Sequence, residues 1–380
     1  MPTKSLPRAF SSRLWRFNAE FWMVIPLLLG FAASEPFWGG SVWSICLVLG
    51  SVLLALLPGL LLRRGGAFPV LSFSLGFVLL RELALRHGLR TAVFALLFSL
   101  PMLLFFMLLF RRQTSFWEGG RTGLWFPALL GLACGAAAVL TLQQGSCYFD
   151  VGAHGADFRA LLGSYRSLGF HANWRTVLFS TIMLVVMITY PRKFRRLSAV
   201  LPASFFGLLL TTALNLWLNP DAARTNVPEV FSPAQAAADP GTPALPFVFL
   251  GGAALAAICF FFALLAPPKP AIPSGSVPNR ASAALALAAL LLSALPVLAL
   301  RRVPTSVFAP VLIVSCWEAI PWRDFGQLFR RRKPVPMLFF VLFLIVVLTL
   351  GTLWAALGAL LTVSAVVFCG RSARFTAQTT

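Results

Sequence analysis

The stretch at residues 126–144, FPALLGLACGAAAVLTLQQ, constrains the fold of this chain most. It is an apolar run with a proline near its start, small residues along its middle and a glutamine pair at its end. About 20 apolar residues in a helix span the hydrocarbon core of a bilayer. Backbone polar groups in lipid must bond within their own segment, which favours helices. Since similar runs recur along the sequence, we predict an all-α polytopic membrane protein.

The sequence contains about twelve such runs, which we predict as transmembrane segments. They are residues 22–38, 41–62, 67–80, 91–110, 125–141, 174–190, 197–218, 245–266, 281–300, 306–317, 335–350 and 353–369. The runs that begin at 67 and 306 are short. Short hydrophobic segments flanked by Gly or Pro are often broken helices in transporters.

The composition supports a membrane class and excludes a nucleic-acid binder. Of the 380 residues, 59% are hydrophobic and only 11% are charged, whereas soluble domains carry about 25% charged residues. The net charge of +20 comes largely from short basic clusters between apolar runs, which is the pattern of the positive-inside rule. Anionic membrane lipid is a sufficient partner for these clusters, and no basic-aromatic module for nucleic acid accompanies them. The clusters are residues 63–64, 111–112, 192–196 and 330–333.

These clusters also predict the orientation in the cell inner (plasma) membrane. With a basic, cytoplasmic N-terminus at residues 1–20, the four clusters lie inside and the loops 145–173 and 219–243 lie outside. The transmembrane domain then covers 21–370, and 371–380 form a cytoplasmic tail. Two basic stretches, 81–90 and 301–302, are inconsistent with this topology because they would face outward.

Metal, cofactor and enzyme chemistry have little support in the sequence. The six Cys residues stand singly, and the three His residues have no ligand spacing. A lipid-linked transferase would present acidic or His clusters near the membrane face, and the sequence shows none. We therefore expect no metal, no cofactor and no enzymatic activity.

Four stretches, taken in order, resemble the transmembrane domain of the SulP family of anion transporters. The first has a Pro entry, a Gly-rich middle and a terminal Gln; the second has a basic turn followed by Leu-Pro-Ala at 201–203. The third reads VPEVFSP. In the fourth, Pro304 opens a short helix and Trp-Arg-Asp at 322–324 stands in an amphipathic linker. The stretches are residues 125–144, 173–218, 227–233 and 301–361.

The resemblance implies a seven-plus-seven inverted-repeat fold that is divided into a gate and a core. The gate-like parts are 125–218 and 303–370, and the core-like parts are 21–110 and 244–300. Counting spans, two core helices, equivalent to the ninth and tenth of the family, are missing here, and we expect no C-terminal regulatory domain.

The same resemblance places an anion between the N-termini of two half-helices, where unpaired N–H groups and the helix dipole attract negative charge. The candidate turns are a Gly pair before the third segment and a Ser-Gly-Ser stretch with a following Arg. The Gly pair has a second interpretation, a simple loop before a helix-start proline. The candidate substrate-binding residues are Gly65, Gly66, Ser274, Gly275, Ser276 and Arg280.

Ionisable residues inside a membrane are functional hypotheses by default. Glu35, at the external end of the first segment, is either a coupling carboxylate or an interfacial residue beside aromatic anchors. Glu82 and Arg86 have the i, i+4 spacing of an intrahelical ion pair, and we expect that pair to be structural rather than a proton relay.

Two functions remain open at this stage. The first is a secondary anion transporter for sulfate, bicarbonate or a dicarboxylate. The second is a non-transporting structural or accessory subunit of a larger membrane complex that reuses this scaffold. The resemblance implies a homodimer for the first, and the missing core helices motivate the second.

Overall fold

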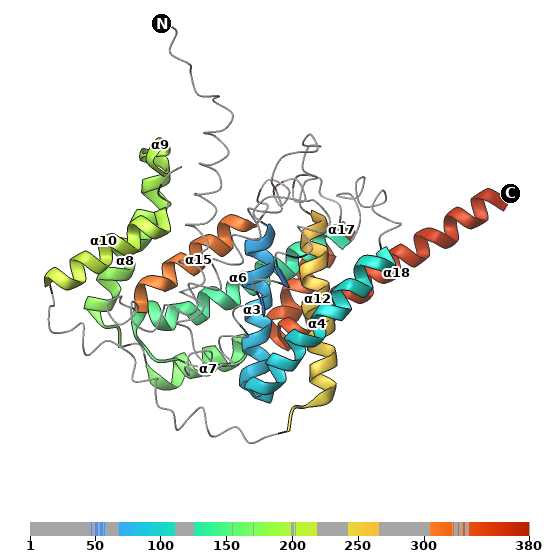
Figure 1. The fold of residues 1–380 in the computed structure, drawn as a ribbon, viewed down its shortest axis with the longest axis horizontal. Helices are drawn as coiled ribbons and strands as arrows, with labels where there is room; N and C mark the ends of the chain where they lie inside the picture. The colour runs from blue at the N-terminus through green and yellow to red at the C-terminus, as the bar shows by residue number, and fades with distance from the viewer. Residues whose placement is uncertain are drawn as a thin grey trace, which may run out of the picture.

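The computed structural model describes residues 68–110, 125–153, 155–169, 171–198, 201, 203–218, 242–265, 305–320 and 334–379, with single positions 47, 50, 51, 54, 55, 57, 322, 326 and 330. All regular structure in these residues is helical (Figure 1). The helices are α3 (Phe68–His87), α4 (Leu89–Phe110), α6 (Trp125–Phe149), α7 (Phe158–Leu168), α8 (Trp174–Lys193), α9 (Arg195–Ser198), α10 (Ala203–Leu218), α12 (Leu245–Leu265), the 3-10 turn η5 (Thr305–Val307), α15 (Phe308–Ala319), α17 (Pro334–Leu350) and α18 (Thr352–Thr379).

The described residues are all-helical, as predicted, and include helices with the length and composition of membrane spans. Within the described residues, four helical stretches are long and apolar enough to cross a bilayer: Leu89–Leu109, Phe126–Phe149, Trp174–Lys193 and Leu245–Ala263. Shorter apolar helices coincide with the predicted runs near 203, 308, 334 and 352. The predicted runs 22–38 and 281–300, and most of 41–62, lie outside the described residues. The total of about twelve spans and the inverted repeat therefore stay predictions.

Four predicted segments differ in extent or continuity from the observed helices, and two of them are only longer at their ends: α6 continues to Phe149 rather than 141, and α18 to Thr379 rather than 369. The helix observed at the run predicted for 67–80 is longer than predicted, because α3 continues through Arg81 and Glu82 to His87. The run predicted at 197–218 is interrupted: α9 ends at Ser198 and α10 begins at Ala203. Pro202 precedes α10 in the sequence, and proline disfavours helical backbone at the residue before it.

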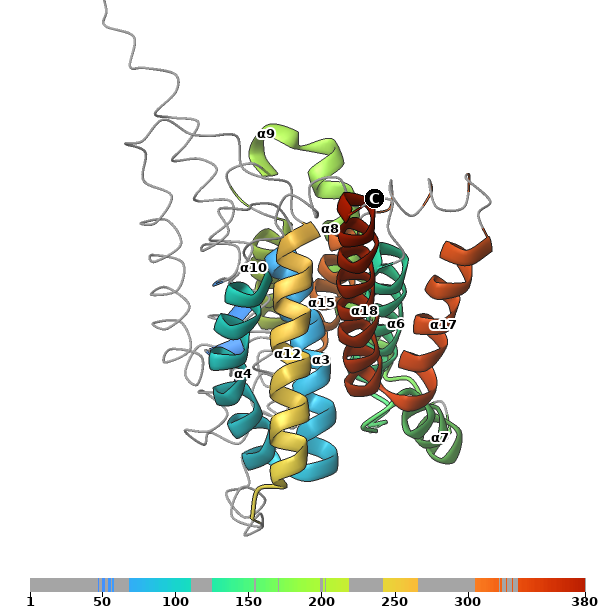
Figure 2. The same cartoon turned by 90° about the vertical axis from the view of Figure 1, so that its right-hand side faces the viewer.

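Helices α3, α4 and α12 pack most extensively on one another, and we call them the core-like unit. Figure 2 shows α12 running between α4 and α3. Close approach depends on small residues of α12: a Cβ on Gly252 would lie 2.9 Å from the Ala95 carbonyl oxygen. At the ends of these helices, the rings of His87 and Phe247 stack with centroids 3.6 Å apart.

The other described helices form a second group, the gate-like unit, in which α6 is central. Helix α6 packs against α17, α15, α18 and α8, while α8 pairs with α10. Gly131 and Gly135 give α6 a flat face toward α17, since a Cβ on either would overlap Phe340 or Val347. This is the small-xxx-small arrangement by which membrane helices pack closely. Helix α18 lies against α12, α6 and α17, at the boundary of the two units (Figure 2).

The close α6–α17 contact predicts that Gly131→Ala destabilises the protein by about 1–3 kcal/mol, the usual cost of overpacking. The added methyl would overlap the backbone carbonyl of Phe340, which cannot move aside as a side-chain tip does. Thermal unfolding of the purified protein in detergent measures the effect. The matched control is Gly163→Ala on α7, where a Cβ meets nothing within 4 Å; equal melting temperatures for the two variants would contradict the packing argument.

Candidate functional site

The predicted binding residues all lie outside the described part of the chain. This holds for Gly65 and Gly66, for Ser274, Gly275, Ser276 and Arg280, and for the candidate coupling residue Glu35. The predicted anion site therefore stays a prediction. The described residues instead show a different charged site, on α3.

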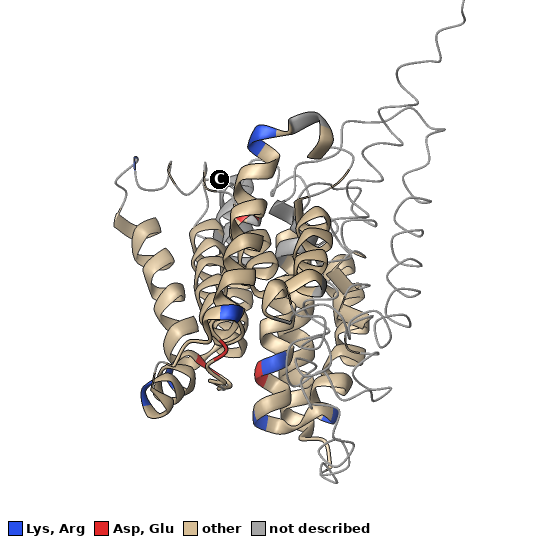
Figure 3. Ribbon diagram, turned by 90° about the vertical axis from the view of Figure 1, so that its left-hand side faces the viewer, with Lys and Arg blue, Asp and Glu red and all other residues tan. Residues whose placement is uncertain are grey.

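Most charged residues of the described helices lie toward helix ends, as Figure 3 shows. Arg81 and Glu82 are the exception, because they lie within α3 with only 7% and 3% of their surfaces exposed. Charges buried in a membrane protein are costly unless they are paired and hydrogen-bonded. Their partners therefore define the site.

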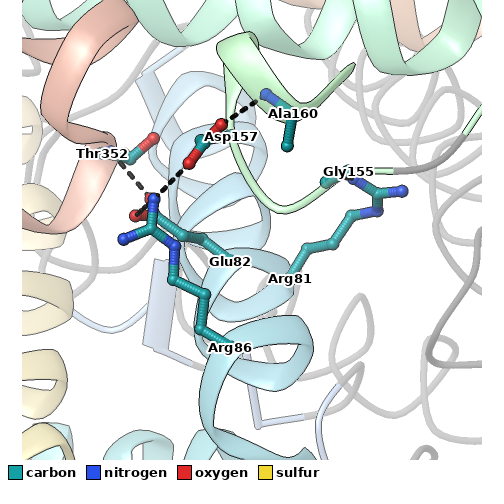
Figure 4. Close-up of polar contacts among 7 residues, drawn as sticks. All are labelled: Arg81, Glu82, Arg86, Gly155, Asp157, Ala160 and Thr352. Atoms are coloured by element: carbon teal, nitrogen blue, oxygen red, sulfur yellow. Dashed lines mark hydrogen bonds and ion pairs between the residues drawn. The ribbon is translucent and has the colours of Figure 1, made fainter. Parts of the chain in front are cut away.

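The Glu82 carboxylate binds the start of α18, 270 residues along the chain. Its Oε2 accepts a hydrogen bond of 2.8 Å from the Thr352 amide, the first residue of that helix. The N-terminus of a helix leaves N–H groups without intrahelical partners and carries the positive end of the dipole. Glu82, which belongs to α3, thus provides a hydrogen-bond acceptor for the N-terminus of α18 (Figure 4).

A glycine permits this approach at the break between α17 and α18. Gly351 has a φ of 101°, a conformation that residues with a side chain rarely adopt. A Cβ at this position would also overlap the Glu82 carboxylate. Gly351 is therefore required both for the turn and for the carboxylate contact.

Arg86 lies between two carboxylates, as Figure 4 shows. Its Nη2 is 2.6 Å from Asp157 Oδ2 and 3.5 Å from Glu82 Oε1, so the predicted i, i+4 pair is confirmed but is the longer of the two. Arg81 points along another side of α3 and donates to the Gly155 carbonyl oxygen at 3.1 Å. We call Arg81, Glu82, Arg86, Asp157 and Thr352, with the Gly155 carbonyl, the α3 charge network.

The α7 partner of this network was not predicted, because residues 145–173 were expected to be a loop. Helix α6 continues to Phe149, and α7 occupies part of the remainder. Asp157 is the N-cap of α7, since its Oδ1 accepts from the Ala160 amide at 2.7 Å, and Gly169 ends the helix with a φ of 70°. An acidic N-cap and a closing glycine around an apolar-periodic run are recognisable signals.

Helix α7 is held against the end of α6 by Tyr165, whose hydroxyl donates to the Leu142 carbonyl oxygen at 2.9 Å. Burial, with a smaller effect of nearby Cys147, raises the pKa of Tyr165 to about 12. The phenol therefore stays protonated and keeps its donor at neutral pH. This bond fixes α7, and with it Asp157, relative to the gate-like unit.

In the part of the chain that the structure describes, no three His, Cys, Asp or Glu residues lie together in a way that could hold a metal ion. The α3 charge network also contains no Ser, Cys or His nucleophile in contact with a base. What it shows is the pairing of charged groups between helices.

No protein-family model matches the sequence, and no curated protein matches it. The fold is nevertheless similar to the transmembrane domain of a membrane transporter. The solved structure is the transmembrane domain of a cyanobacterium bicarbonate transporter, BicA, with a TM-score of 0.58 and 14% sequence identity. The match covers 92% of this chain and 98% of that chain. At this identity the likeness is one of fold.

Because Gly351 has a positive φ and faces a carboxylate, Gly351→Ala should destabilise the protein by about 1–3 kcal/mol, as expected for a residue forced into a sparsely populated backbone region. Thermal unfolding in detergent reports the loss. Gly358→Ala in α18, the helix that follows the turn, is the control, since its Cβ would make an ordinary 3.5 Å contact with Phe343. A melting temperature unchanged by Gly351→Ala would show that this turn tolerates a side chain.

Proposed function

We propose that this protein is a SulP-like secondary transporter of an inorganic anion or dicarboxylate, working as a multi-pass protein of the inner membrane. The observation that carries the proposal is the fold likeness to the transmembrane domain of a bicarbonate transporter, over 92% of this chain. Bicarbonate belongs to the anion class that the sequence resemblance suggests. The match also extends over 98% of the other chain.

The proposal needs a core and a gate. In it, α3, α4 and α12, which fall in the segments 21–110 and 244–300, belong to the core, and the described helices of 125–218 together with η5, α15, α17 and α18 belong to the gate. Alternating access in transporters is largely a rigid-body movement of one such bundle against the other around a fixed site.

In this proposal the anion lies between two helix N-termini, one following Gly65 and Gly66 and the other near Ser274, Gly275 and Ser276. Backbone N–H groups at helix N-termini bind anions, and Arg280 adds a guanidinium that is always protonated. Glu35 is the candidate for coupling to a proton. The termini are cytoplasmic, and the working form is a homodimer.

Uptake into proteoliposomes tests the proposal. We expect the purified protein to take up labelled bicarbonate, sulfate or succinate with saturable kinetics. Losing a charged hydrogen bond to the anion costs about 1.5–3 kcal/mol, so Arg280→Ala should lower uptake by about tenfold or more. The control is Arg224→Ala, which removes the same charge from the predicted external loop 219–243.

Isolation of the tagged protein in mild detergent addresses the accessory-subunit alternative. A homodimer without companion chains agrees with the transporter. If none of the three anions is taken up and the protein is recovered in stoichiometric amounts within a larger complex, the transport proposal is wrong and the accessory role replaces it.

A further inference from the structure

The α3 charge network joins the two units. Arg81, Glu82 and Arg86 belong to α3 of the core-like unit, whereas Gly155 and Asp157 adjoin α7, and Thr352 begins α18. The bonds from Arg81 to Gly155, from Arg86 to Asp157 and from Thr352 to Glu82 therefore all cross the boundary between the units. These contacts join the last turns of α3 to the segment that follows the end of α6 and to the start of α18, directly after α17 ends.

We propose that the α3 charge network is a latch that holds the core-like unit against the gate-like unit in this conformation and opens as one when the units move apart. Its role in transport rests on the function proposed above, but its cooperative opening does not. None of the residues of the latch belongs to the predicted anion site.

The side chains of the network are exposed to different degrees, which is consistent with contacts that break in order as the units separate. The Glu82 side chain is 4% exposed, whereas those of Arg86 and Asp157 are 31% and 24% exposed. Water can therefore replace the Arg86–Asp157 contact first, since an ion pair that water already reaches is weakly held. Apolar packing alone has no such discrete partners, whereas paired charges give one defined closed arrangement.

Sharing of Arg86 makes the parts of the network interdependent. The guanidinium contacts Asp157 of the gate-like unit and Glu82 of its own helix, and Glu82 in turn binds the Thr352 amide. Removing charge at either carboxylate changes the partners left to the other. If the contacts were independent, removing one would loosen the structure only beside the substituted residue. In a latch, removing one loosens both the segment around Asp157 and the start of α18.

Hydrogen exchange of the full-length protein in nanodiscs, read by mass spectrometry, tests this interdependence. The variants are Glu82→Gln and Asp157→Asn, which keep shape but remove charge. Asparagine caps a helix as well as aspartate does, so Asp157→Asn spares the bond to the Ala160 amide. We expect exchange to rise about tenfold at both 155–161 and 350–356 in each variant, as for the loss of a charged hydrogen bond.

Asp150→Asn is the matched control. Asp150 is also a carboxylate of the segment after α6, but its Oδ2 bonds Asn173 and Thr176 within the gate-like unit. It should leave exchange at 350–356 unchanged. Exchange that rises only beside each substituted residue, or rises equally in Asp150→Asn, would overturn the latch.

A reversible cross-link tests whether the latch opens during transport. In a Cys147→Ser background, Arg86→Cys with Asp157→Cys is bridged by a cleavable bifunctional thiol reagent, and Asp150→Cys with Thr176→Cys is the control pair. We expect the first bridge to reduce anion uptake at least tenfold until it is cleaved, and the control to leave uptake unchanged. Unchanged uptake with the 86–157 bridge closed would overturn the latch. If the unmodified protein takes up no anion, the proposed function fails, and the exchange experiment alone decides on the latch.

Discussion

The burial of one carboxylate, Glu82, against the first amide of α18 is the contact on which the rest of the described arrangement depends. A carboxylate within a helix of a membrane protein must find donors or remain neutral. Here the donors come from a helix end 270 residues away in the sequence. This bond ties α3 to the start of α18, and the contacts of Arg86 with Asp157 and of Arg81 with Gly155 are made from the same part of α3.

Glycines determine where such contacts are possible. Gly131 and Gly135 bring α17 onto α6, Gly252 brings α12 onto α4, and Gly351 turns the chain beneath Glu82. In lipid, helices gain little from hydrophobic burial and associate through close packing and a few polar bonds. The fold therefore combines small-residue seams within each unit with a polar network across the boundary.

Length and hydropathy predicted most helices well, because a bilayer leaves few alternatives to an apolar helix. The limits of α4, α8, α12 and α17 agree with the predicted runs within a few residues. Hydropathy predicted the wrong helix end where charged residues interrupt an apolar run. It ended the third segment at residue 80, directly before Arg81, although α3 continues. It also missed α7, whose signal is an N-cap and amphipathic spacing rather than an apolar run.

The i, i+4 spacing identified Glu82 and Arg86 as a pair, but no local pattern could indicate Asp157 or Thr352 as their distant partners. Arg81 and Arg86 belong to the basic stretch 81–90, which is inconsistent with the predicted orientation, and in the structure they bind Gly155 and Asp157.

The sequence separation of these partners has a consequence for how the protein is made. When α3 enters the membrane, the intrahelical pair of Glu82 and Arg86 can form at once, but Asp157 is 71 residues further on and Thr352 is 270 residues further on. At about 5–20 residues per second, the second interval lasts roughly 15–50 seconds. During that time Arg86 gains Asp157 once residue 157 has been made, whereas the Glu82 carboxylate still lacks the Thr352 amide. The contacts of α3 seen in the structure are therefore complete only after α17 has been synthesised.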